Sequence, residues 1–294
     1  MKLAPTVKLA NGVKMPHSGF GVYQIPDADK CAQAVADAVS TGYRLIDTAA
    51  AYFNEAAVGD GIRRAQATGT PREELFITSK VWVQDAGYAE THAAFKESLS
   101  RLGLDYLDLY LIHQPLGDYY GSWRAMEELL DAGLVRAIGV CNFDEERLAD
   151  LCLSASVAPM VDQVEAHPFY QRPQLQQVMA DYGVQPESWA TLAEGRNGIF
   201  THPVLAEIGA AHSKTAAQVA LRWNAQRGTV VLAKSTKPER MAQNLDIWDF
   251  ELTDGEMSRI AGLDEGASLF DYGTAAGARA RHEFKVHEQS DSFE

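Results

Sequence analysis

The chain has 294 residues, 46% of them hydrophobic, and its 26 basic and 40 acidic side chains give a formal net charge of −14 at pH 7. A chain of this length can bury a full hydrophobic core without disulfides or a structural metal. The negative charge disfavours non-specific binding to nucleic acid or anionic membranes, so a phosphate-bearing ligand would require a local basic pocket.

The cysteines and the N-terminal residues indicate in which cellular compartment the protein is expected. Cys31, Cys141 and Cys152 are an odd number at scattered spacings, with no C-x-x-C pair, which argues against a disulfide framework. The N-terminus lacks the apolar stretch of a secretory signal, and no segment approaches the ~18 apolar residues of a membrane span. We expect a cytoplasmic protein with no membrane partner.

The chain begins with a hairpin signal and then alternates between two patterns. Asn11-Gly12 lies between apolar-polar runs at 7–9 and 13–15, which predicts a β-hairpin. Strand-like runs follow at 19–23, 44–47, 75–80, 107–113, 135–141, 160–165, 184–190 and 229–233. Helical patterns occupy 29–41, 55–68, 89–102, 122–132, 144–154, 173–182, 215–227, 238–245 and 254–263.

The residues at the helix ends and the composition of the strands favour one fold class. Gly42, Gly103 and Gly183 follow predicted helices where a C-cap takes positive φ, and Asp144 is placed as an N-cap. Continuous apolar strands such as 107–112 are typical of parallel sheets buried on both faces. Eight βα repeats therefore predict an α/β fold, a (β/α)₈ TIM barrel in a single domain over residues 1–294, with an N-terminal hairpin and an extra C-terminal helix.

Two other expectations accompany the barrel. The competing arrangement is an open doubly wound sheet, but the G-x-G-x-x-G signal of dinucleotide-binding members stops after Gly19-Phe20-Gly21. Residues 266–294, including 275–281 and 286–294, carry no periodicity and are expected to form a loose tail or loop.

Polar residues follow three consecutive strands of the predicted barrel, where a barrel assembles its active site. Asp47 and Tyr52 follow the second strand, Lys80 ends the third and His113 ends the fourth. A tyrosine of reference pKa ~10 becomes a better acid beside a desolvated ammonium, which Asp47 would keep charged. The alternative is an Asp47–Lys80 ion pair that only neutralises buried charge, with Tyr52 and His113 in structural roles.

These residues lie in segments that resemble the aldo-keto reductases. The matching segments are 42–55 (GYRLIDTAAAYFNE), 77–82 (ITSKVW), 107–113 (LDLYLIH), 139–143 (GVCNF), 161–163 (VDQ) and 234–235 (KS). The resemblance covers about residues 5 to 265 and is closest to bacterial members such as the 2,5-diketo-D-gluconate reductases. It implies a barrel that binds NADPH without a Rossmann domain and reduces carbonyls to alcohols. By this resemblance Tyr52 is the general acid, Lys80 and Asp47 tune it, and His113 orients the carbonyl.

The resemblance also implies cofactor contacts. Asn142 and Gln163 match the pair that bonds the nicotinamide carboxamide, Trp189 matches the aromatic that stacks on its ring, and Cys141 stands where a serine is usual. The site for the adenosine 2′-phosphate and adenine would be formed by Lys234, Ser235, Thr236, Arg240 and Asn244. A helix N-terminus with added cations suits an anion on physical grounds, and this favours NADPH over NADH.

The segment 189–195 (WATLAEG) departs from the family pattern, and Glu194 there would either repel the pyrophosphate or point outward as part of a clasp. Gln114 replaces a common tryptophan after the catalytic histidine. The substrate pocket is expected to include Tyr23, Trp82 and Gln114, with Phe53 as a further candidate. The C-terminal segment lacks the family's usual tail, so the substrate is poorly specified.

We therefore expect NADPH-dependent reduction of a small-molecule aldehyde or ketone by a monomer or weak homo-oligomer that uses no metal and binds no nucleic acid. One alternative is a non-enzymatic nicotinamide-binding redox sensor or regulatory subunit. A metal-dependent barrel hydrolase is another, but the chain has no H-x-H strand motif, and His113 with His167 is a thin ligand set.

Overall fold

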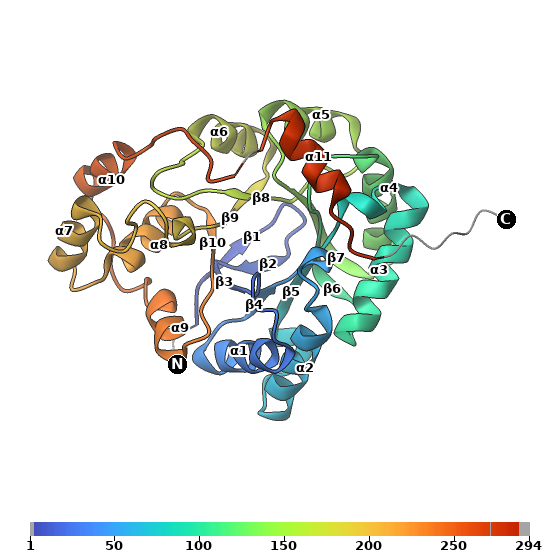
Figure 1. The fold of residues 1–294 in the computed structure, drawn as a ribbon, viewed down its shortest axis with the longest axis horizontal. Coiled ribbons are helices and arrows are strands. Elements are labelled where there is room, and N and C mark those ends of the chain that lie inside the picture. Colours follow the sequence, from blue (N-terminus) through green and yellow to red (C-terminus); the bar gives the residue numbers. More distant parts are fainter. Residues whose placement is uncertain (1–2, 271, 288–294) are drawn as a thin grey trace.

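The computed structural model describes residues 3–270 and 272–287, and its centre is a closed barrel of eight parallel strands (Figure 1). Around the barrel the strand order is β10-β3-β4-β5-β6-β7-β8-β9. The strands are β3 (Ser18–Gly21), β4 (Leu45–Asp47), β5 (Phe76–Val81), β6 (Leu107–Ile112), β7 (Val135–Cys141), β8 (Val161–Glu165), β9 (Gln185–Trp189) and β10 (Val230–Ala233). The prediction of a (β/α)₈ barrel is confirmed, and the open sheet is excluded.

The opening hairpin is present and lies at the end of the barrel where the strands begin. Strands β1 (Thr6–Lys8) and β2 (Lys14–Pro16) pair antiparallel. The Asn11 side chain accepts a hydrogen bond from the backbone N–H of Val13 and donates one to the carbonyl of Arg136, at the start of β7. The hairpin is therefore on the opposite end from the carboxyl ends of the strands.

The predicted helices are found close to their expected bounds. They are α1 (Ala28–Thr41), α2 (Glu55–Ala67), α3 (Tyr88–Leu102), α4 (Tyr119–Asp131), α5 (Glu145–Ser154), α6 (Pro173–Tyr182), α8 (Ala216–Gln226), α9 (Pro238–Leu245) and α10 (Asp254–Ala261). Asp144 caps α5 by accepting the N–H of Arg147 at 2.9 Å. Gly103 and Gly183 end α3 and α6 in the left-handed conformation that favours glycine.

Short 3₁₀ helices occupy four of the connections. They are η1 (Ala50–Tyr52), η2 (Arg72–Glu74), η3 (Val83–Asp85) and η4 (Ala193–Gly195). Three of them, η1, η3 and η4, follow β4, β5 and β9, so they lie at the end of the barrel where the strands finish.

Two helices depart from the sequence prediction. Helix α7 (Pro203–Ala211) inserts between β9 and β10 and buries Leu205 and Ile208 in a cluster shared with α8. Helix α11 (Ala275–Glu283) forms where a loose tail was expected, and that expectation is wrong for these residues. Thr274 caps α11 by accepting the N–H of Gly277, but the helix has no buried residue and so no apolar stripe to reveal it. The rest of the predicted tail, 288–294, lies outside the described residues.

The segments 266–270 and 272–287, which together we name the C-terminal strap, cross the carboxyl ends of the barrel strands. Figure 1 shows α11, in red, lying over the barrel on the side of α4 and α5. The Ser268 hydroxyl and the Leu269 N–H both donate to the carboxylate of Glu165, at the end of β8. Farther along, the indole N–H of Trp82, just after β5, donates to the carbonyl of Phe284 at 2.9 Å.

Across 3–270 and 272–287, the structure contains no helix that combines the length and the apolar character needed to cross a membrane.

Candidate active site

A cavity of about 560 Å³ opens at the carboxyl ends of the strands, beneath the C-terminal strap. Each of the eight barrel strands, or the residues directly after it, contributes to its wall. The contributors are Gly21, Asp47, Trp82, His113, Cys141, Gln163, Trp189 and Leu232, in strand order, together with Tyr52 and Lys234. The end of the barrel that the sequence identified therefore holds a cavity.

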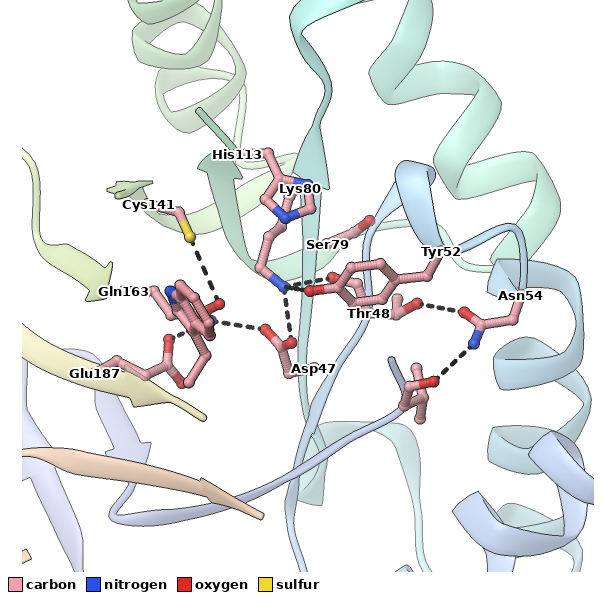
Figure 2. A network of polar contacts seen from close by, with 12 residues as sticks. Asp47, Thr48, Tyr52, Asn54, Ser79, Lys80, His113, Cys141, Gln163 and Glu187 are labelled. Carbon is pink, nitrogen blue, oxygen red and sulfur yellow. Dashed lines mark hydrogen bonds and ion pairs between the residues drawn. The ribbon is translucent and has the colours of Figure 1, made fainter. Parts of the chain in front are cut away.

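Tyr52 is held in place by the loop that follows β4. The Thr48 hydroxyl donates to the Asn54 side-chain oxygen at 3.0 Å, and the Asn54 amide donates to the carbonyl of Val22 at 3.0 Å. These bonds tie both ends of η1 to the barrel (Figure 2). Tyr52, the last residue of η1, is thereby presented to the cavity.

The structure brings Asp47, Tyr52 and Lys80 into direct contact. The buried Lys80 ammonium donates to Asp47 Oδ1 at 2.7 Å, to the Thr48 carbonyl at 3.0 Å and to Tyr52 Oη at 3.3 Å. Because an ammonium only donates, the Tyr52 oxygen accepts in this contact. The phenolic hydrogen is therefore not used by Lys80 and is available to a group in the cavity.

The electrostatics of this pair differ from the sequence expectation. Burial lowers the pKa of Lys80, but Asp47 and Tyr52 outweigh it, so the pKa lies above its ordinary value and the ammonium stays charged. Burial raises the pKa of Tyr52, and Lys80 offsets this only in part. The expectation of a lowered pKa for Tyr52 is wrong in this structure, because the cost of burying a phenolate exceeds the attraction of the ammonium.

His113 stands beside Tyr52 on the cavity wall. Its ring centroid lies 5.5 Å from that of Tyr52 and 5.0 Å from that of Trp82, both in edge-on geometry. Burial, and then the charge of Lys80, hold the pKa of His113 well below its ordinary value. The imidazole is therefore neutral at pH 7 and acts as a hydrogen-bonding group without a charge.

Gln163 connects Asp47 to a second buried carboxyl group. Its amide nitrogen donates to Asp47 Oδ2 at 2.8 Å and to Glu187 Oε2 at 2.9 Å, as Figure 2 shows. Its amide oxygen lies 3.7 Å from Cys141 Sγ, within reach of the thiol hydrogen. The sequence analysis did not single out Glu187 as a site residue.

Asn142 and Trp189 bond to each other at the cavity wall. The indole N–H of Trp189 donates to the Asn142 side-chain oxygen at 2.9 Å, and the Asn142 amide donates to the carbonyl of His113 at 3.1 Å. The Trp189 ring meets Phe270 and Tyr272 of the strap edge-on, at 5.4 and 5.8 Å.

The predicted phosphate pocket follows β10, the strand that pairs with β9. Lys234 lines the cavity and donates to the Gln24 side-chain oxygen at 3.4 Å. Thr236 and Arg240, at the start of α9, are exposed, whereas Ser235 and Asn244 are half-buried. Of these residues only Lys234 reaches the cavity wall, and the others continue from it along the surface.

Three of the predicted substrate residues line the cavity and one does not. Tyr23, Trp82 and Gln114 are on the wall, and the Tyr23 ring lies 5.0 Å from that of Tyr52. Phe53 is 65% exposed, contacts Phe284 at 5.8 Å between ring centroids and is not on the wall. The structure therefore places Phe53 outside the cavity, because its left-handed backbone (φ 58°) follows the turn at the end of η1.

The sequence analysis missed the contribution of the strap. Its residues on the wall are Phe270, Tyr272, Ala280, Arg281 and Phe284, and Arg281 lies over the ring of Tyr272 at 4.7 Å. The signal in the sequence was three aromatic residues in a segment without helical or strand periodicity.

The divergent loop after β9 also lines the cavity. Ala190, Ala193 and Glu194 all have positive φ, between 47° and 49°, which is unfavourable for residues with a Cβ. Glu194 is exposed and on the cavity wall.

Among the described side chains there is no cluster of three or more His, Cys, Asp or Glu residues that could hold a metal ion.

Comparison with known proteins decides the family. The family model "Aldo/keto reductase family" matches residues 18–201 and 199–265. This protein belongs to the aldo/keto reductase family. It is 47% identical over 264 residues to the glyoxal reductase of Bacillus subtilis, covering 90% of this chain and 94% of that protein. The morphine 6-dehydrogenase of Pseudomonas putida is 45% identical over 281 residues, covering 90% and 93%.

A solved structure gives the same answer for the fold. The Bombyx mori aldo-keto reductase in complex with NADP superposes with a TM-score of 0.88 at 32% identity, covering 92% of this chain and 96% of that one. As an aldo-keto reductase, this protein is an NADP-dependent oxidoreductase. The alternatives of a non-enzymatic sensor and of a barrel hydrolase are therefore wrong.

The residues around the cavity fit the cofactor that the family uses. A nicotinamide carboxamide needs a hydrogen-bond donor and an acceptor. On the cavity wall, Gln163 supplies an amide oxygen that can accept, and Asn142 supplies a second side-chain amide. Phosphate needs cations outside the barrel core, and Lys234 and Arg240 are such cations in a chain of strongly negative charge.

Proposed function

We propose that this aldo-keto reductase reduces small aldehydes and ketones with NADPH, with Tyr52 as the proton donor. The observation that carries the proposal is the contact of Tyr52 with Lys80 at 3.3 Å, beside His113 on the cavity wall. When bound, NADPH supplies the hydride, so the protein must hold the carbonyl and deliver a proton.

Each residue of the site has a separate part in that step. Tyr52 gives its hydrogen to the carbonyl oxygen, since its own oxygen already accepts from Lys80. The ammonium then stabilises the phenolate, and Asp47 keeps the ammonium charged and aimed. The neutral His113 orients the carbonyl oxygen by hydrogen bonding.

Cofactor binding is assigned to two groups of residues, one on the cavity wall and one that follows β10. Gln163, Asn142 and Cys141 would hold the carboxamide, and Trp189 would stack on the nicotinamide ring. Lys234, Ser235, Thr236, Arg240 and Asn244 would hold the 2′-phosphate and the adenine, which favours NADPH over NADH.

The proposed substrates are small dicarbonyls and keto sugars, among them compounds like 2,5-diketo-D-gluconate. Tyr23, Trp82 and Phe284 supply an aromatic wall, whereas Gln114 adds an amide that can bond a second oxygen. The name of the glyoxal reductase relative is in line with two adjacent carbonyls.

Turnover tests this function directly. The wild-type protein should oxidise NADPH with a panel of simple aldehydes, dicarbonyls and keto sugars, and NADPH deuterated at the transferable position should leave its label on the alcohol carbon. Dicarbonyls should have the highest kcat/KM. Binding of NADPH without turnover of any carbonyl in the panel would contradict the proposal.

A further inference from the structure

The buried polar network continues past Asp47 to a residue that does not line the cavity. Asp47 is on β4 and Gln163 is on β8, which are opposite strands of the barrel, and Glu187 on β9 is the register partner of Gln163. Glu187 is fully buried and absent from the cavity wall. It therefore acts on a ligand only through its neighbours.

The carboxyl groups of Asp47 and Glu187 both accept hydrogen bonds from the side-chain nitrogen of Gln163. That nitrogen carries two hydrogens, and it donates to Asp47 Oδ2 at 2.8 Å and to Glu187 Oε2 at 2.9 Å. Reversing the amide would set its oxygen against Asp47, where two acceptors repel. With both hydrogens engaged, the amide is fixed and its oxygen faces the Cys141 side of the cavity.

We propose that Glu187 is a positioning residue for the cofactor, because it engages the second hydrogen of the Gln163 amide and so fixes the amide oxygen as an acceptor for the nicotinamide carboxamide. This inference rests on the proposed function, in which Gln163 contacts the nicotinamide. Glu187 itself touches neither cofactor nor substrate.

The protonation of Glu187 suits this arrangement. Burial and the nearby Asp47 raise the pKa of Glu187 to about 8. At neutral pH its side chain is mostly a neutral acid whose carbonyl oxygen accepts from Gln163, which a glutamine in its place would imitate. A methionine would fill the same space without an acceptor, and an aspartate would retain the carboxyl group but withdraw it by one methylene.

The test is the Kd for NADPH at pH 7, measured by quenching of protein fluorescence. Loss of one oriented hydrogen bond predicts about 5- to 10-fold weaker binding for Glu187→Met and Glu187→Asp, and Glu187→Gln should restore the wild-type Kd to within about 2-fold. In a Gln163→Ala background, Glu187→Met should have no further effect, because its target is gone.

Two results would overturn the inference. One is an unchanged Kd in Glu187→Met or, if that variant does not fold, in Glu187→Asp. The other is an equal loss from Glu187→Met with and without Gln163, which would assign the effect to general packing. A wild-type protein that binds no NADPH would instead contradict the proposed function, and this inference with it.

Discussion

At Tyr52, burial and the neighbouring ammonium act on the phenol in opposite directions, and burial has the larger effect. The phenol therefore keeps its hydrogen at neutral pH, as the proposed role of proton donor requires. In the proposed reaction, Lys80 acts mainly when the proton has left, by stabilising the phenolate that burial disfavours. Its three hydrogen bonds fix the ammonium in position for that step.

Glu187 also predicts a pH dependence of stability. The pKa of Glu187 is about 8 in the folded protein against 4.5 for a free glutamate, so between these values the folded state holds a proton that the unfolded chain has released. Stability from this group is complete below pH 4.5 and is lost as the pH rises through 8. Asp47 and Lys80 are the charged groups that act on it.

Urea unfolding at pH 6 and pH 9 measures this effect. The wild type should lose about 3 kcal/mol of unfolding free energy relative to Glu187→Gln over this range, since the difference spans about two pH units and one pKa unit corresponds to about 1.4 kcal/mol. Parallel changes in the two proteins would contradict the raised pKa.

At the scale of elements, the proposed function makes the start of α9 responsible for the preference between the two dinucleotides. Lys234 follows β10, and Arg240 lies in the first turn of α9, where the positive end of the helix dipole favours an anion. The 2′-phosphate is the only difference between NADPH and NADH, so charges there discriminate between the two.

Replacement of both cations tests this assignment. Lys234→Gly with Arg240→His should weaken NADPH binding by about 10- to 100-fold, which corresponds to about 1.4–2.7 kcal/mol, and should leave the Kd for NADH within about 2-fold. Titration of both dinucleotides against the same preparation provides the comparison. Equal losses for the two would contradict a 2′-phosphate site at α9.

The helices and strands also show which parts of the fold can be predicted from the sequence. The strands and most helices were predictable, because continuous apolar runs and caps such as Asp144 and Gly183 mark them locally. Helix α7 was missed because its residues are almost all apolar, so no polar stripe marks a helical period. Helix α11 was missed for the opposite reason, since it buries nothing.

At the scale of the whole molecule, the site joins segments that are far apart in the chain. Residues that end strands could be assigned to one mouth from the sequence, because parallel strands of a barrel finish on the same side. The bond of Gln163 to Asp47 could not, since it depends on which strands face each other across the closed barrel. The contribution of the strap could not be predicted from the sequence either, because its aromatic residues reach the cavity only through the path of the chain after α10.

We expect the C-terminal strap to affect substrate binding more than cofactor binding. Removal of residues 266–294 takes away the wall formed by Phe270, Tyr272 and Phe284 but leaves the barrel and Lys234. We expect KM for the carbonyl substrate to rise about 10-fold, with a smaller change in the Kd for NADPH.

A point variant gives the matched comparison. Gln84 is not on the cavity wall, and its side chain accepts from the N–H of Val286 at 2.8 Å and donates to the carbonyl of His287 at 2.9 Å. Gln84→Ala should therefore raise KM in the same direction but less. An unchanged KM after complete removal of the strap would show that it does not form part of the substrate site.

The most direct test of the account is the rate of carbonyl reduction by Tyr52→Phe under saturating NADPH. The variant keeps the ring but loses the hydroxyl, so it should bind NADPH with a Kd within about 2-fold of wild type and reduce carbonyls about 10²- to 10⁴-fold more slowly. Reduction at the wild-type rate by a folded Tyr52→Phe protein would contradict the assignment of Tyr52 as the proton donor.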